Sequence, residues 1–176
     1  VANCVPFATA RSTQIGFRWD LARTFTTISL AAGTPPTVTA TRANAGDGTV
    51  DVGVFVVEFD PAQVRVQQGT FSIANGATTP AAAPTITAVN LAKAALVTYN
   101  TGADATNNEW RDFAVEAWFS STTTLGIQRN GTSAVVSGHW YALEALGSQF
   151  SVQSVNASLG RGVTSATPAI SAVDMS

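Results

Sequence analysis

The sequence is poor in the residues on which most catalytic and metal sites depend, with one cysteine, Cys4, and one histidine, His139, among 176 residues. A single cysteine excludes an internal disulfide, and one thiol with one imidazole falls short of the ligand set of a zinc site. Asp47 and Asp51 are the best cluster of oxygen ligands, but they lack the spacing of a calcium loop. The sequence also contains no glycine-rich phosphate loop. We therefore expect no metal and no other cofactor, and we assign no cofactor-binding residue.

Charge is scarce as well. Asp, Glu, Lys and Arg make up 11% of the chain and the formal net charge is −2, whereas charged residues are about a quarter of an average protein. Nucleic-acid binding relies on a basic patch, and this sequence has no basic run. The most apolar stretches, such as 52–59, are about eight residues long, far below the roughly 20 that cross a bilayer. We expect neither a nucleic-acid partner nor a membrane span.

Few residues are available for catalysis. His139 is the one imidazole that could activate a nucleophile, and nothing around Cys4 resembles an activating motif. Asp112 and Glu116 would share a strand face about 13 Å apart by strand rise, too far for the paired carboxylates of a glycosidase. We therefore expect a protein that is not an enzyme and assign no catalytic residue.

Short strands and tight turns dominate what is present. Ala, Thr, Val, Ser and Gly fill the chain, and apolar residues alternate with others along 50–56 and 113–119. This period of two is typical of β-strands. No segment keeps a helical apolar pattern for three turns without a Gly, a Pro or a β-branched cluster. The pattern predicts an all-β fold with little helix.

The two halves of the sequence align with each other. Phe7 and Thr9 match Leu96 and Thr98, 89 positions further on. Further matches keep their order at offsets of 87, 86 and 84, and they pair Ile28, Leu30, Val38, Ala40 and Arg42 with Val115, Ala117, Leu125, Ile127 and Arg129; Glu58, Val64, Val66 and Gln67 with Glu144, Phe150, Val152 and Gln153; and Pro84, Ile86, Ala88 and Val89 with Pro168, Ile170, Ala172 and Val173. The alignment predicts a tandem duplication with units 1–89 and 90–176.

Each unit is expected to contain about six strands. In the first unit these are 4–10, 24–31, 37–42, 49–60, 64–73 and 84–89. Units of this size favour small antiparallel sandwiches, so we expect two tandem, jelly-roll-like β-sandwich domains. The turn sequences 44–48 and 130–131, rich in Asn and Gly, predict a hairpin with positive φ in each unit.

Three tryptophans, Trp19, Trp110 and Trp118, have no aromatic counterpart in the other unit. We expect them at contacts with neighbouring subunits or between the two units. The long strands 49–60 and 134–145 are apolar on both faces and therefore need cover on both. The other unit and further copies of the chain are the available partners.

The repeat resembles β-rich units in structural proteins of tailed bacteriophages and prophages. Three features of each unit carry this resemblance: a Thr-rich run ending in Arg (38–42 and 124–129), a long strand ending in an apolar residue with Glu (54–59 and 140–144), and a strand with Val-Gln (66–67 and 152–153). It implies a capsid decoration protein, a head fibre or a tail-fibre part. It also implies that the protein is located on the virion surface or outside the cell. Its partners would be further copies of the chain and other virion proteins.

The same pattern is loosely similar to the H-type lectin domain, in which a strand with a Trp near its end lies beside a sugar site. Trp140 takes that place here, with Val54 at the matching position of the first unit. This alternative predicts ligand contacts from His139, Trp140 and Tyr141 and a surface glycan as ligand. Alternation along the strand would place His139 with Tyr141 and opposite Trp140.

Overall fold

A computed structural model describes residues 2–12, 26–42, 49–103, 110–148, 152–153, 164–165, 167 and 169, and the chain is all-β as expected. Its strands are β1 (Cys4–Ser12), β2 (Thr27–Ala31), β3 (Thr37–Thr41), β4 (Val50–Glu58), β5 (Val64–Ile73), β6 (Ala94–Ala103), β7 (Glu116–Phe119), β8 (Leu125–Gln128) and β9 (Val135–Ala145). Two short helical elements are η2 (Leu91–Lys93) and α2 (Trp110–Phe113).

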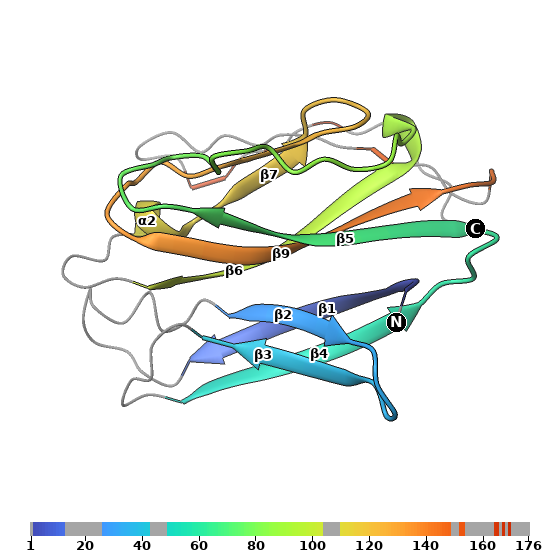
Figure 1. Ribbon diagram of the computed structural model, residues 1–176, viewed down its shortest axis with the longest axis horizontal. Coiled ribbons are helices and arrows are strands. Elements are labelled where there is room, and N and C mark those ends of the chain that lie inside the picture. Colours follow the sequence, from blue (N-terminus) through green and yellow to red (C-terminus); the bar gives the residue numbers. More distant parts are fainter. Residues whose placement is uncertain are drawn as a thin grey trace.

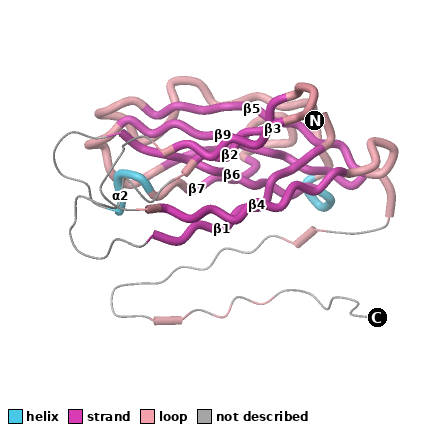
Figure 2. Tube along the Cα trace, turned by 90° about the horizontal axis from the view of Figure 1, so that it is seen from below, coloured by secondary structure: helices cyan, strands magenta, loops and turns pink. Residues whose placement is uncertain are grey.

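The strands form four antiparallel groups: β1–β4, β2–β3, β5–β9–β6 and β7–β8. In Figure 1 the three-stranded sheet lies in the middle, with β1 to β4 below it and β7 above it. The view from below shows most strands running along the long axis of the molecule (Figure 2). The structure is therefore arranged in three tiers, which we call lower, central and upper.

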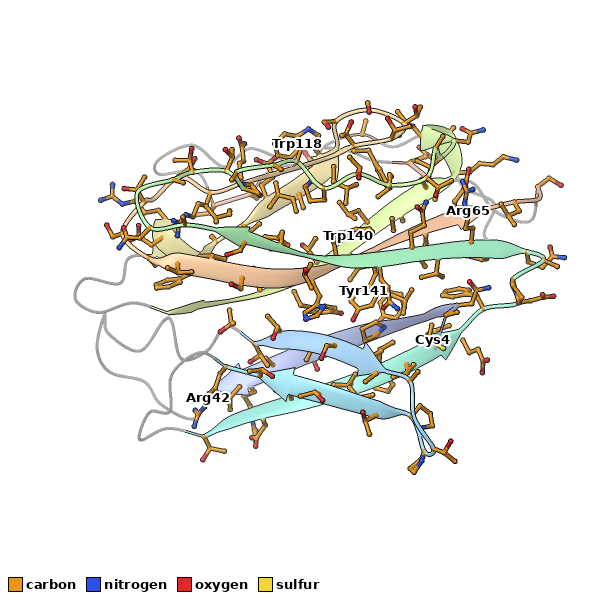
Figure 3. The ribbon with its side chains drawn as sticks, in the orientation of Figure 1. Cys4, Arg42, Arg65, Trp118, Trp140 and Tyr141 are labelled. Carbon is orange, nitrogen blue, oxygen red and sulfur yellow. The ribbon has the colours of Figure 1, made fainter. Side chains whose placement is uncertain are left out.

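Strand β9 is the middle strand of the central sheet and is buried on both faces over residues 140–145. Successive side chains of a strand point to opposite faces, so Trp140 and Ala142 enter one core while Tyr141 and Leu143 enter the other. Figure 3 shows Trp140 and Tyr141 on opposite sides of the sheet. The upper core joins Trp140 and Ala142 to Phe71, Ile73, Phe113, Leu125, Ile127, Ala134 and Val136, and the lower core joins Tyr141 and Leu143 to Val5 and Val64. Both faces of the segment are thus covered over residues 140–145, whereas Val135 and Ser137 near its start are exposed.

The segment predicted as a strand at 84–89 forms only an isolated bridge, Thr85↔Thr124, so that prediction is wrong. Three backbone hydrogen bonds still join the segment to 122–125: Ile86 N–H to the Thr123 carbonyl, Val89 N–H to the Thr122 carbonyl and Leu125 N–H to the Pro84 carbonyl. Side chains add further contacts. The amide of Gln67 donates to the Thr87 carbonyl at 2.9 Å and accepts from the Thr87 N–H at 2.6 Å. Pro84 has no N–H to contribute to a sheet. The predictions for 4–10, 24–31, 37–42, 49–60 and 64–73 overlap β1 to β5.

The predicted duplicate hairpin is also wrong. Residues 43–48 lie outside the described part, but β3 pairs with β2 and β4 pairs with β1, so the two strands flanking that link do not pair. Likewise β8 and β9, which flank 130–131, belong to different sheets. Among the described residues only Gly76 has positive φ. Gly131 serves close packing instead, because a Cβ there would lie 2.1 Å from the Asp112 Oδ1.

The strand registers repeat along the chain. Adding 88 to both members of the pair Phe7↔Phe55 gives Ala95↔Leu143, which is a pair of β6 and β9. The hairpins β2–β3 and β7–β8 match by the same shift. The expected boundary at residue 89 nevertheless cuts a continuous sheet, because β5 pairs with β9 along its whole length. The division into 1–89 and 90–176 stays a prediction, and these two units would share the central sheet.

Candidate functional site

The β1–β4 pair carries large apolar side chains that are exposed. Phe55 lies opposite Phe7 in the β1–β4 pair, and their exposed fractions are 70% and 38%. Val56 and Val57 on β4 and Val38 on β3 are exposed as well. All five residues of β3 are exposed. Because successive side chains of a strand point to opposite faces, Phe7, Phe55 and Val57 share one face of the β1–β4 pair and Val56 points to the other. We call Phe7, Phe55 and Val57 the outer apolar face, and exposed apolar patches mark interaction sites.

One edge of β4 has no neighbouring strand in the part of the chain that the structure describes. The Phe59 N–H donates to the Asn3 carbonyl at 2.9 Å, so Phe59 and Asn3 form a hydrogen-bonded pair. Hydrogen-bonded and non-hydrogen-bonded pairs alternate along an antiparallel ladder, and Phe55↔Phe7 is therefore also a hydrogen-bonded pair. The alternate residues Val52 and Val54 therefore direct their N–H and C=O groups away from β1. Tyr99 supports this assignment. Its hydroxyl bonds the Ala8 N–H and the Pro6 carbonyl, which point away from β4 and belong to the pairs that alternate with Phe55↔Phe7.

Two tyrosine hydroxyls attach the lower tier to the central sheet. The Tyr99 hydroxyl donates to the Pro6 carbonyl and accepts from the Ala8 N–H, both at 2.9 Å. The Tyr141 hydroxyl donates to the Ile28 carbonyl at 3.0 Å. The two rings meet edge to face with centroids 6.5 Å apart. Burial raises the pKa of both phenols, so both remain protonated donors at neutral pH.

The three tryptophans predicted as interface residues have different positions. Trp19 lies outside the described residues, and Trp110 begins α2 but its side chain is outside the described part. Trp118 on β7 is 40% exposed and lines an open groove of about 780 Å³ between β6 and β7. Figure 3 shows it in the upper tier, on the far side of the central sheet from the outer apolar face.

The residues predicted for ligand contact do not form one surface. Trp140 is 6% exposed, and Tyr141 is 1% exposed in the other core. A Cβ on Gly69 would lie 2.5 Å from the Trp140 ring, which shows how closely that ring is covered. Neither ring offers a face on which a sugar could stack. His139, half-buried, is the only one of the three that reaches a groove.

This groove, of about 860 Å³, runs between β2–β3 and the end of the central sheet. Burial lowers the pKa of His139 below its ordinary value of 6.5, so the ring is neutral at pH 7. Side-chain hydroxyls form much of the remaining lining and come from Thr27, Ser29, Thr41, Thr70, Ser72, Thr85, Thr101 and Ser137. The lower face of the central sheet is thus apolar toward Leu143 and rich in hydroxyls around His139. The Thr27 hydroxyl donates to the Thr41 carbonyl and the Ser72 and Ser137 hydroxyls bond each other, while Phe71 and residues 80–84 add apolar surface. The groove therefore combines polar and apolar surface and contains no charged side chain in its lining.

Arg129 is a buried structural site that sequence reasoning missed. Its exposed fraction is 3%, and its guanidinium donates to four backbone carbonyls, those of Ala74, Ala77, Asp112 and Ala134, at 2.7 to 3.1 Å. Burial lowers its pKa, while the Asp112 carboxylate raises it. In sequence, Arg129 ends the Thr-rich run of the second unit as Arg42 ends that of the first. Such a pattern does not indicate that the side chain is buried. The site holds loops of the upper tier together.

Acidic side chains in the described part are separate rather than clustered. Glu144 accepts from Arg65, its neighbour on β5, and from the Asn90 N–H, and the second contact attaches the start of η2 to the central sheet. No group of three His, Cys, Asp or Glu residues that could hold a metal occurs among the described residues. Within the same residues no helix has the length and apolar character to span a membrane.

Comparison with known proteins gives no match. No protein-family model, no curated protein sequence and no solved structure matches this chain. The functional argument therefore depends on the geometry of the outer apolar face, the β4 edge and the His139 groove.

Proposed function

We propose that the chain is a non-enzymatic structural protein of a virion surface, either a capsid decoration protein or a fibre component. Its two tandem, jelly-roll-like β-sandwich units would act through contacts with copies of the chain and with other virion proteins. The resemblance of each repeat to phage structural proteins supports the virion part of this proposal. The exposed apolar lower tier supports the part that concerns repeated protein contacts.

One observation carries the proposal. The C-terminal part of β9, residues 140–145, is covered on both faces by its own chain, whereas the matching segment around β4 leaves Phe55 70% exposed. Both segments have the composition of a doubly covered strand. A partner that covers the outer apolar face would give β4 the environment that β9 already has. Charge is sparse on this face, so its association should change little with salt.

Two measurements test this function. Sedimentation of the purified full chain should show mass increasing with concentration, nearly unchanged between low and high salt. Mass spectrometry of purified tailed particles from the organism that encodes the chain should detect its peptides at many copies per particle. A chain that stays monomeric at all concentrations would contradict the building-block role, and its absence from the particles would contradict the virion location.

The groove at His139 favours a second candidate function, a carbohydrate-binding adhesin. Its hydroxyls suit a neutral glycan, although Trp140 and Tyr141 are buried away from it. Binding on a glycan array that is lost in His139→Ala and kept in Val135→Ala would support this candidate, because Val135 is exposed on β9 and does not line the groove. An array without any bound glycan would remove it.

A further inference from the structure

The β7–β8 pair carries an exposed aromatic ring on its outer side. Side chains of β7 alternate between two environments: Ala117 and Phe119 pack against the upper core, whereas Glu116 and Trp118 are exposed. Trp118 lines the open groove of about 780 Å³ between β6 and β7, which we call the Trp118 groove. Figure 3 shows this residue in the upper tier, on the far side of the central sheet from β1 to β4. Contacts made through the lower tier would therefore leave the ring accessible.

Gly126 fixes the position of the Trp118 ring. The two residues are direct partners in the β7–β8 ladder, and a Cβ on Gly126 would lie within 2.8 Å of the Trp118 Cδ2, Cε2 and Cζ2 atoms. Cδ2 and Cε2 form the bond that the two rings of the indole share, so Gly126 lies against a face of the indole and not against its edge. A ring held in this way loses little freedom on binding, and its opposite face can receive a ligand.

Two planar polar side chains lie next to this ring. Glu116 precedes Trp118 by two residues and therefore points to the same face of β7, and Gln128 is its cross-strand partner. The Gln128 Nε2 donates to the Glu116 Oε2 at 2.9 Å, and both side chains line the Trp118 groove. This contact uses one N–H of the amide and one carboxylate oxygen. The second N–H, the amide oxygen and the other carboxylate oxygen keep their capacity to bond a ligand.

This arrangement has the chemistry of a saccharide site. One face of a pyranose ring presents C–H groups, whose slightly positive hydrogens are attracted to the negative face of an aromatic ring. The sugar hydroxyls both donate and accept, which matches the carboxylate of Glu116 and the amide of Gln128. Among the described residues that line the groove, Glu116 carries the one charge and no cation is present. The site therefore disfavours anionic ligands such as phosphates or sialic acid.

We propose that the Trp118 groove binds a neutral oligosaccharide, with one pyranose ring stacked on Trp118 and its hydroxyls bonded to Glu116 and Gln128. The groove has the volume of a small-ligand site. It shares no lining residue with the groove at His139, and this inference goes beyond the proposed structural function. If copies assemble through the lower tier, each adds one sugar site, so a weak single-site affinity would be strengthened by multivalency.

Sugar binding by the full chain tests this inference. The probes are the neutral trisaccharides of glucose, galactose and mannose, titrated while the backbone amide signals of β7 and β8 are followed by NMR. We expect at least one probe to bind with a Kd on the order of 1 mM, because one stacking ring in an open groove gives weak affinity. Trp118→Ala should weaken this binding about tenfold or more. Phe55→Ala is the matched control, because it removes an exposed ring from the outer apolar face and should leave the sugar affinity unchanged.

Two further variants test the geometry. Gly126→Ala displaces the ring without altering Trp118 itself, so it should weaken binding several-fold. Glu116→Ala with Gln128→Ala removes the hydrogen-bonding groups beside the ring and should weaken binding about tenfold. Circular dichroism and melting temperature show whether each variant is folded. Unchanged affinity in both folded variants would contradict the proposed orientation of the sugar.

The outcomes separate this inference from the other proposals. Binding that is kept in Trp118→Ala and lost in His139→Ala would place the sugar in the His139 groove and overturn the inference. Binding of choline without any sugar would show recognition of a cation by the ring and Glu116, which also overturns it. Loss of self-association in Trp118→Ala but not in Phe55→Ala would make Trp118 a contact between copies instead. If no probe binds up to about 20 mM, the inference is wrong and the building-block role is unaffected.

Discussion

Phe55 lies directly opposite Phe7 on the surface of the β1–β4 pair. The matching strands of the central sheet, β9 and β6, instead pack against the two cores. Their neighbour Val57 is 39% exposed as well. Exposed aromatic residues contribute little to the stability of an isolated chain, but they contribute strongly when a partner covers them. The following predictions distinguish the residues that hold the fold from those that hold the assembly.

Phe55→Ser should weaken self-association while leaving the fold intact. The ring is 70% exposed, so we expect the free energy of unfolding to change by only about 0.5 kcal/mol. Sedimentation velocity across a concentration series measures the association. Val135→Ser is the matched control, because Val135 is 42% exposed but lies outside the outer apolar face. Equal association of both variants would show that Phe55 is not at the contact.

Arg129→Met should destabilise the protein strongly. It leaves four carbonyls without their charged donor in the interior, which costs on the order of 3–5 kcal/mol. Arg11→Met removes only the exposed pair with Asp51 and should cost about 0–1 kcal/mol. Urea denaturation of the two variants measures the difference. Similar midpoints for both would contradict the structural role of the Arg129 site.

Gly69→Ala should destabilise the upper core, while Gly53→Ala should be tolerated. A Cβ at position 69 would lie 2.5 Å from the Trp140 ring, and overpacking of this kind costs about 1–3 kcal/mol. At position 53 the nearest atom is the Thr9 Oγ1 at 3.3 Å, so a small shift of one side chain suffices. Thermal melts compare the two. A higher melting temperature for Gly69→Ala would mean that Trp140 is less tightly covered than described.

The free energy of unfolding should decrease as the pH is lowered, and His139 should account for part of this decrease. Burial lowers its pKa in the folded state below 6.5, so the unfolded chain binds the proton more tightly. The contribution of the neutral ring is therefore fully present above the ordinary pKa and is lost as the pH falls below it, toward the folded pKa. The difference in unfolding free energy between the unchanged protein and His139→Gln, measured from pH 8 to pH 5, should shrink or reverse over that window. A constant difference would contradict a buried neutral ring.

Tyr99→Phe should loosen the lower tier. The hydroxyl satisfies both the Pro6 carbonyl and the Ala8 N–H, and its loss leaves two half-buried backbone groups without a partner. Amide exchange in β1 should accelerate about tenfold or more, while exchange in β7 stays unchanged. Uniform acceleration across both strands would indicate global destabilisation rather than a local attachment.

Much of the strand content could be predicted from alternation alone. The segment 64–73 became β5, and the apolar stretch 134–145 became β9, because period-two patterns and apolar runs indicate strands. Burial did not follow from the same patterns, since the apolar run of β4 is largely exposed. Pairing partners could not be predicted, since β5 crosses the repeat boundary to pair with β9. Partner choice depends on long-range packing that no local pattern records.

The candidate site was less predictable than the fold. The similarity to the H-type lectin domain, which places a Trp beside the sugar site, predicts a ligand contact for Trp140, yet Gly69 leaves room for its ring inside the upper core. Arg129 gave no signal, because buried and exposed arginines look alike in sequence. The exposure of Phe55 appears only when β4 is seen to lack the cover that β9 has.

Hydrogen exchange of the β4 amides at several protein concentrations tests the central claim most directly. Val52 and Val54 direct their N–H groups outward, so in dilute solution these amides should exchange at nearly unprotected rates. If another copy covers this edge, their exchange should slow by about tenfold or more as concentration rises, while the amides of β9 stay unchanged. Rates at Val52 and Val54 that are independent of concentration would contradict the account.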